Sequence, residues 1–135
     1  ALIKQLSPYT SVISNSGAEV VSPGYPDKAP ANETQYTQVV RAEKCQRAVL
    51  TFQDFHIEPR SAINNRCAFS YLEIRSDVSV PEGKIFCGKE IEKGTAFKSD
   101  KSELILHYMN HEYIKKNGYR GYKATFTTEN IPDCS

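Results

Sequence analysis

Apolar and polar residues alternate along most of the chain, in short runs that are typical of β-strands with one buried face. Two runs carry the clearest pattern, 46–53 and 103–109, because each places three apolar side chains on one face. Those side chains are Ala48, Leu50 and Phe52 in the first run, and Leu104, Leu106 and Tyr108 in the second. Further strands are predicted at 17–21, 35–42, 69–75, 83–87 and 121–127.

The spaces between these runs contain residues that interrupt regular structure, and no stretch shows a clean helical period. The breakers are Pro59, Pro81–Gly83, Gly94 and Asn117–Gly118. Many short strands at near-regular spacing predict an all-β sandwich or barrel. Residues 1–15 show no strong pattern, so we expect an N-terminal arm there and one domain over 16–135.

The four cysteines change the picture from a generic β-domain to an extracellular one. An even number of cysteines in a short chain predicts disulfides, which persist in an oxidising compartment. No two cysteines are close enough in the sequence for the paired spacing of a structural zinc site. Asn32-Glu33-Thr34 is an acceptor for N-glycosylation and adds support for secretion.

Composition excludes several classes of partner. The net charge of +1 gives no overall attraction to nucleic acid, and no apolar run is long enough for membrane insertion. Ala1–Leu6 is too short and polar for a signal peptide, which favours a mature protein or an excised module. The stretch Lys84–Lys123 holds nine basic and five acidic residues. This excess of positive charge is either an ordinary solvated face or a binding site for a sulfated glycan or an acidic protein.

Four pieces of the chain, in this order, resemble the CUB domain family, which consists of extracellular β-sandwich modules. The segment 16–26 is similar to the family's opening Gly-x-Ile-x-Ser-Pro-x-Tyr-Pro pattern, and 50–58 resembles its central strand, which ends in Ile57-Glu58. The segment 67–74 with Phe86-Cys87-Gly88 resembles the family's second disulfide unit. Glu103–Tyr108 followed by Gly121–Phe126 is similar to its closing strands.

The resemblance implies two antiparallel sheets packed face to face, with a jelly-roll topology, and a disulfide between Cys67 and Cys87. Strands that each have one apolar face lead independently to the same sandwich. The earlier cysteine pair of typical family members is absent, and Cys45 and Cys134 have no usual counterpart. These two either pair with each other or leave Cys134 to pair with a neighbouring domain or a second chain.

Many CUB domains bind calcium through a tyrosine, a glutamate and two aspartates, and this ligand set is degraded here. Glu58 matches the glutamate, whereas Ser70 and His111 stand where the resemblance places the aspartates, and Ala29 falls near the tyrosine. One carboxylate is a poor set for calcium, so we expect no metal and no cofactor. A Glu58–His111 contact would instead favour the charged imidazolium; the alternative is an ordinary exposed histidine.

Residues that could support catalysis do not form a recognisable set, so we do not expect an enzyme. No serine lies in a Gly-x-Ser-x-Gly elbow, and the chain has no phosphate loop and no His-Glu-x-x-His motif. His56 sits mid-strand beside apolar residues, where a structural role is favoured over a role as a base.

The loop Tyr113–Gly118 is the best candidate for binding, since it joins two late strands and exposes aromatic, aliphatic and basic side chains. Tyr113, Ile114, Lys115 and Lys116, together with His111 and Glu58, are the predicted partner-binding residues. Tyr119 and Tyr122 are expected to be core or rim residues of the last strands.

These features together predict a secreted, non-catalytic module that binds another extracellular protein, and Lys115 and Lys116 favour an acidic partner. One alternative is a glycan-binding domain of the seminal-plasma CUB type, which would bind heparin-like sugars through the Lys84–Lys123 stretch. The other alternative is a regulatory domain of a secreted protease.

Overall fold

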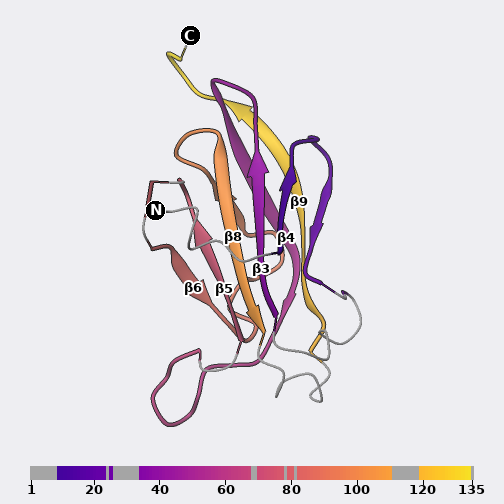
Figure 1. Ribbon diagram of the computed structural model, residues 1–135, viewed down its shortest axis with the longest axis vertical. Helices are drawn as coiled ribbons and strands as arrows, with labels where there is room; N and C mark the ends of the chain where they lie inside the picture. The colour runs from indigo at the N-terminus through magenta and orange to yellow at the C-terminus, as the bar shows by residue number, and fades with distance from the viewer. Residues whose placement is uncertain are drawn as a thin grey trace.

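The chain folds into two β-sheets that pack face to face (Figure 1). The structure, a computed structural model, describes residues 9–23, 25, 34–67, 70–77, 79–80, 82–110 and 119–134. The five-stranded sheet has the order β1 (Tyr9–Ile13), β3 (Thr34–Arg41), β8 (Glu103–Asn110), β5 (Ser70–Arg75) and β6 (Lys84–Phe86). The four-stranded sheet has the order β2 (Glu19–Val21), β9 (Gly121–Asn130), β4 (Gln46–His56) and β7 (Ala96–Lys98). The predicted all-β sandwich is confirmed.

The core lies between the two sheets and is built from the alternating positions of the sequence. Ala48, Leu50 and Phe52 of β4 are buried, and so are Leu104, Leu106 and Tyr108 of β8. Tyr122, Ala124 and Phe126 continue the four-stranded side of the core from β9. The period of two in these strands therefore predicted the correct buried face.

A β-bulge in β4 changes which positions of that strand face the core. The pairing of β4 with β9 shifts between Phe52 and Asp54, so Gln53 is the extra residue. Buried positions accordingly move from Phe52 to Phe55 and Ile57. The bulge lets β4 run as far as His56, three residues beyond the end predicted from alternation.

Two short strands were not predicted. β7 has only three residues, and Phe97 is its one side chain that packs against the core. β1 pairs in parallel with β3, from Tyr9 opposite Tyr36 to Ile13 opposite Val40. Residues 9–13, which we expected within an N-terminal arm, therefore form an edge of the five-stranded sheet, while the domain boundary at residue 16 stays a prediction.

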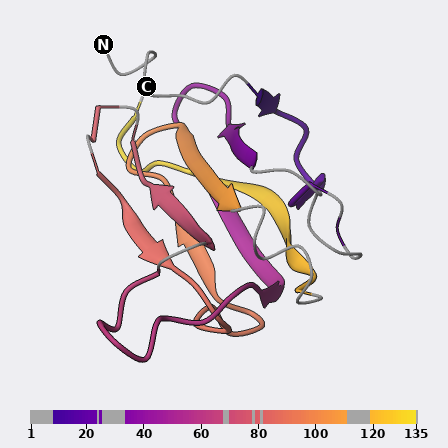
Figure 2. The ribbon, with the colours of Figure 1, turned by 60° about the horizontal axis from the view of Figure 1, so that its bottom comes forward.

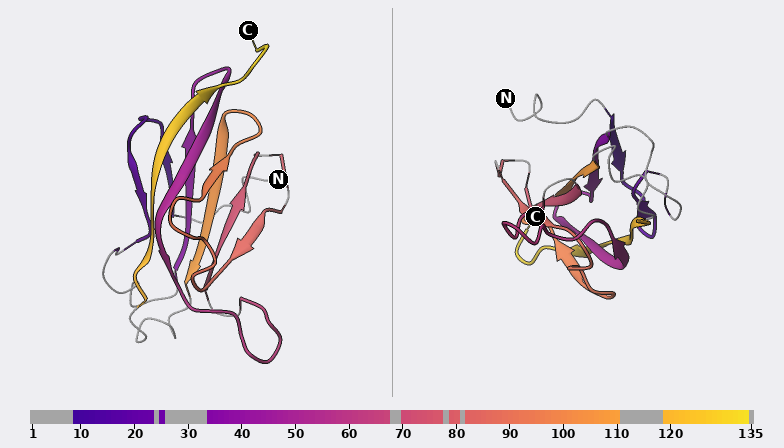
Figure 3. Two further views of the ribbon diagram at one scale, coloured as in Figure 1. Left: turned by 180° about the vertical axis from the view of Figure 1, so that it is seen from behind. Right: turned by 90° about the horizontal axis from the view of Figure 1, so that it is seen from below.

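Two disulfides tie the sandwich together. Cys45, in the turn between β3 and β4, is bonded to Cys134 after β9, with 5.4 Å between their Cα atoms. Cys67, just before β5, is bonded to Cys87 after β6, with a Cα–Cα distance of 5.9 Å. Because Cys134 follows β9 and Cys67 precedes β5, the first bond lies at the end where β9 finishes and the second lies at the opposite end. Figure 1 and the left view of Figure 3 show these two ends of the strands.

None of the described segments forms a helix with the length and apolar character needed to cross a bilayer.

Candidate interaction surface at the loop end of the sandwich

Several strands begin or end together at the end of the sandwich that carries the Cys67–Cys87 bond. The register sets Asn110, the last residue of β8, between Thr34 and Ser70, the first residues of β3 and β5. His56 at the end of β4 lies opposite Gly121 at the start of β9. The connections after β4 and after β8 therefore leave from one end of the fold, which we call the loop end (Figure 2).

Of the predicted partner-binding residues, only Glu58 lies within the described part of this loop end, where Ser70, from the expected calcium positions, is also described. Glu58 follows β4 and is partly buried, and its carbonyl oxygen accepts a 2.9 Å hydrogen bond from the backbone N–H of Gly88. Ser70 begins β5 and is 1% exposed. The other predicted partner-binding residues and the glycosylation site lie outside the described residues: His111, Tyr113, Ile114, Lys115, Lys116 and Asn32.

The described donors at the loop end do not fit the calcium site that the family implies. Glu58 supplies one carboxylate, and the position of an aspartate is occupied by the buried hydroxyl of Ser70. Calcium requires six to eight oxygen ligands, most of the compensating charge coming from carboxylates. Among the described residues, the one cluster of three potential metal ligands is Cys67, Cys87 and Glu90, and its two cysteines are joined in a disulfide. The described part of this end therefore provides no calcium site.

The loop end contains an ion pair that was not predicted from the sequence, and a tyrosine hydroxyl supports it. The Arg120 guanidinium donates two hydrogen bonds to the Asp54 carboxylate, at 2.9 Å from Nε and 2.8 Å from Nη2. The Tyr25 hydroxyl donates a third to the same carboxylate at 2.8 Å. The bonds from Arg120 lower the pKa of Asp54 to about 2. This arrangement fixes the chain just before β9 against β4 and leaves a paired, rather than a free, arginine.

His56 lies beside this pair and has a packing role in the structure. Its ring meets that of Tyr119 edge-on, with 5.1 Å between the ring centres. Its Nδ1 is buried, and the part of the chain that the structure describes offers that atom no hydrogen-bond partner. Burial, with Arg120 nearby, lowers the pKa of His56, which keeps the imidazole neutral at pH 7. A partly buried, neutral ring packed on a tyrosine agrees with the structural role that we favoured for this histidine.

Several cations of the Lys84–Lys123 stretch are engaged in ion pairs. Lys98 pairs with Glu129 at 3.0 Å, and Lys123 pairs with Glu19 at 3.3 Å. Arg120 is paired with Asp54, as described above. Acidic side chains on β2, β4 and β9 thus neutralise part of the excess positive charge of this stretch. Tyr122 of the same stretch is fully buried and its hydroxyl donates to Gln38, as expected for a core residue, whereas Tyr119 is partly exposed.

The comparisons with known proteins agree with this architecture. The family described as CUB domain matches residues 10–126. The chain belongs to the CUB family. It is 34% identical over 114 residues to cubilin of Canis lupus familiaris, covering 82% of this chain and 3% of that protein. It is 32% identical over 126 residues to tolloid-like protein 2 of Mus musculus, covering 91% of this chain and 11% of that protein.

Solved structures similar to this CUB domain support the fold alone, because their sequence identities are low. The CUB1-EGF-CUB2 domains of rat MASP-1 match with a TM-score of 0.74 at 18% identity, covering 93% of this chain and 44% of that one. The MASP-1 CUB2 domain bound to Ca2+ matches with a TM-score of 0.67 at 17% identity, covering 87% of this chain and 96% of that one. CUB domains are typically extracellular protein-interaction modules, a setting that fits a domain with two disulfides. The chain spans only a small part of cubilin and tolloid-like protein 2.

Proposed function

We propose that this chain is a secreted, non-catalytic CUB module that mediates an extracellular protein–protein interaction. The observation that carries the proposal is that β4 and β8 end, and β5 and β9 begin, at the same end of a disulfide-bonded sandwich. Loops held on a rigid scaffold are the usual place for recognition in β-sandwich domains. The charge pattern of the loop between β8 and β9 favours an acidic partner.

The proposed contact residues at the loop end are Glu58 and residues of the segment between β8 and β9. Tyr113 and Ile114 supply apolar anchors, and Lys115 and Lys116 raise the rate of encounter with an acidic surface. His111 joins them as the residue beside the degraded calcium site. Tyrosines at the centre of an interface commonly control dissociation, whereas charges at its rim control association.

Capture from the source organism's extracellular fluid, followed by mass spectrometry, would supply a partner for kinetic tests. Tyr113→Ala should then raise the dissociation rate by roughly 5- to 30-fold, which corresponds to an anchor worth about 1–2 kcal/mol. Lys115→Glu with Lys116→Glu should mainly lower the association rate and flatten its dependence on salt.

A matched control for the charge reversal uses Lys44→Glu with Lys101→Glu, because both lysines are exposed near the opposite end of the sandwich. This control should leave both rate constants unchanged. Binding that is unaffected by all the loop variants, at an unchanged melting temperature, would place the interface elsewhere.

A glycan-binding role through the Lys84–Lys123 stretch is less favoured, because three of its cations are paired with Glu129, Glu19 and Asp54. Retention on a heparin column as a function of salt separates the two roles. Elution below about 0.15 M salt would agree with protein recognition, since a site that uses many cations is retained to higher ionic strength.

A further inference from the structure

The loop Ser61–Arg66, between β4 and β5, projects beyond both sheets at the loop end (Figure 3, left). Its own hydrogen bonds give it a defined shape. The Ser61 N–H donates to the Arg66 carbonyl at 2.9 Å, and the Asn65 N–H donates to the Ser61 carbonyl at 2.8 Å. The Ser61 hydroxyl and the Asn64 side-chain oxygen each accept a further backbone N–H, from Ile63 and Arg66. The loop is therefore closed on itself by four bonds.

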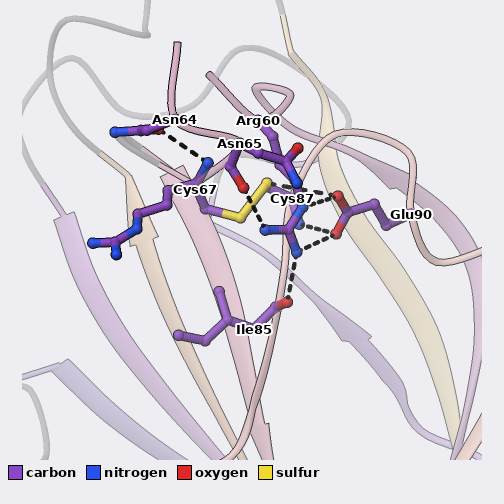
Figure 4. The surroundings of a disulfide bond; sticks show 8 residues. Arg60, Asn64, Asn65, Cys67, Ile85, Cys87 and Glu90 are labelled. Atoms are coloured by element: carbon purple, nitrogen blue, oxygen red, sulfur yellow. Dashed lines mark hydrogen bonds and ion pairs between the residues drawn. A yellow bond between two sulfur atoms is a disulfide. The ribbon is translucent and has the colours of Figure 1, made fainter. Parts of the chain in front are cut away.

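Arg60 anchors the base of this loop to the neighbouring turn (Figure 4). Its guanidinium donates to the Glu90 carboxylate, at 2.6 Å from Nε and 3.2 Å from Nη2. It also donates to the carbonyl oxygen of Asn65 at 3.1 Å and to that of Ile85 at 3.5 Å. A single side chain thus connects the loop, the edge strand β6 and the turn that follows it.

The Cys67–Cys87 disulfide closes the same base covalently. Cys67 follows the loop directly. Cys87 follows β6, the strand whose Ile85 carbonyl accepts a hydrogen bond from Arg60. The Glu90 carboxylate that receives Arg60 also accepts the backbone N–H of Cys87 at 3.1 Å. Both ends of the loop are held by strong interactions, so its tip needs little ordering when it meets another surface.

Ile63 occupies the tip of this loop and is 96% exposed. A single exposed aliphatic residue is ordinary on a protein surface. Here the residue stands on a preorganised, projecting support, and such a support lowers the entropic cost of inserting the side chain into a pocket. The same loop carries a cation, because Arg66 lies three residues after Ile63 in the chain and is exposed. Arg66 forms no ion pair with a described residue, whereas Glu90 at the base of the loop is paired with Arg60.

We propose that the loop Ser61–Arg66 is a rigid docking element, which inserts Ile63 into an apolar pocket with an acidic rim on a partner protein. The proposal rests on the proposed function of the chain as a protein-binding module. It adds a contact that is separate from the predicted loop between β8 and β9. The pocket is apolar because the inserted group is aliphatic, and its rim is acidic because the exposed Arg66 belongs to the same loop.

The test uses the 135-residue chain and a displayed library of recombinant extracellular protein domains as the probe. Enriched domains are measured against the parent and against Ile63→Asp, Ile63→Val and Val12→Asp. Val12 is a matched control, because it is 51% exposed on β1, at the opposite edge of the sheet from β6. Ile63→Asp should weaken binding at least tenfold, whereas Ile63→Val and Val12→Asp should bind within about threefold of the parent. Arg66→Glu should weaken binding further as salt is lowered.

Two additional readouts keep a folding defect apart from a lost contact. All variants at position 63 should keep the parent's melting temperature, because the side chain is exposed. Arg60→Ala should speed hydrogen exchange of the Asn65 amide and weaken binding while Ile63 remains present.

Domains that bind Ile63→Asp as tightly as the parent, but lose binding to Tyr113→Ala, would overturn this inference and leave the proposed function standing. A library that yields no domain binding the parent would count against both. Binding that depends on Ile63 but is unaffected by Arg66→Glu would overturn the acidic rim.

Discussion

The two disulfides close opposite ends of the sandwich, and they hold different kinds of structure. Cys45–Cys134 spans 89 residues and joins a tight turn to the segment that follows the last strand. The amide of Ile131 also donates to the Cys45 carbonyl at 2.9 Å, so this end is closed by backbone as well as sulfur. Cys67–Cys87 spans 20 residues and holds the base of a projecting loop.

This difference separates global stability from local order. In the chain-entropy model the gain from a disulfide grows with the length of the loop that it closes. The long bond should therefore contribute more to the free energy of unfolding, whereas the short one should decide how well the Ser61–Arg66 loop keeps its shape. A domain built in this way can vary its Ser61–Arg66 loop without loosening the closure at its far end.

The largest expected effect is that of removing the far closure, through Cys45→Ala with Cys134→Ala. The closed loop of 89 residues predicts a loss of about 4–5 kcal/mol in the free energy of unfolding. Urea unfolding monitored by circular dichroism measures this loss. The ratio of the hydrogen-exchange rate of the Asn65 amide to the rate expected from global unfolding should be the same in this variant as in the parent. A loss smaller than that of the other disulfide variant would break the comparison.

The second effect is that of Cys67→Ala with Cys87→Ala, which removes the bond at the loop base. The closed loop of 20 residues predicts a smaller loss of about 3 kcal/mol. Amides of residues 61–66 should exchange faster by a larger factor than amides in β4 and β9. Exchange that rises uniformly over the whole domain would show that this bond has no local role.

A third and smaller effect concerns acid stability at the loop end. Arg120 holds the folded-state pKa of Asp54 at about 2, below the ordinary value of about 4 in the unfolded chain. The stabilisation is therefore complete above pH 4 and is lost as the pH falls from 4 towards 2. Because the Arg120 side chain is 46% exposed, solvent screens the pair and we expect about 1 kcal/mol.

Asp54→Asn provides the check on this acid effect. The variant should be less stable than the parent at pH 6, and the gap should narrow as the pH approaches 2. Chemical denaturation at a series of pH values measures both curves. Parallel curves across that range would mean that the pair does not couple to folding.

The smallest expected effect is that of calcium. Because the described positions of the family's calcium site hold a single carboxylate, Glu58, and a buried serine, Ser70, the melting temperature in excess calcium and in chelator should agree within about 1 °C. A specific ion at a hundred times its dissociation constant would add about 2.7 kcal/mol, a shift of several degrees. A shift of that size would make the loop end a metal site and reverse our account of it.

The sequence predicted the buried faces well, because alternation is a local property. Leu50 and Leu104 were assigned to the core from their neighbours alone, and both are fully buried. The bulge at Gln53 could not be predicted in this way, since one extra residue shifts the phase without changing the residue types. The strand β1 was missed for a related reason: its pairing partner β3 begins more than twenty residues later in the chain.

The candidate surface was less predictable than the core, because its contacts join distant segments. Asp54 and Arg120 are 66 residues apart, and only the pairing of β4 with β9 brings them together. Arg120 counts as one of the basic residues of the Lys84–Lys123 stretch when only the sequence is considered. That count overstates the positive charge available to a partner, because Arg120 is paired with Asp54. The loop after Pro59 was read only as a break between strands, and its anchoring by Arg60 depends on Glu90, thirty residues away.

The closure at Cys45 and Cys134 also determines how the fold carries a mechanical load. A pull on residue 134 passes through sulfur to the start of β4, the neighbour of β9 in the sheet. The force therefore does not break the hydrogen bonds between β9 and β4 one at a time from Asn130. The disulfide carries part of the force directly to β4, next to the Gln46–Asn130 pair. When the C-terminal end of the domain is pulled, the Cys45–Cys134 disulfide therefore keeps β9 from separating from the sheet.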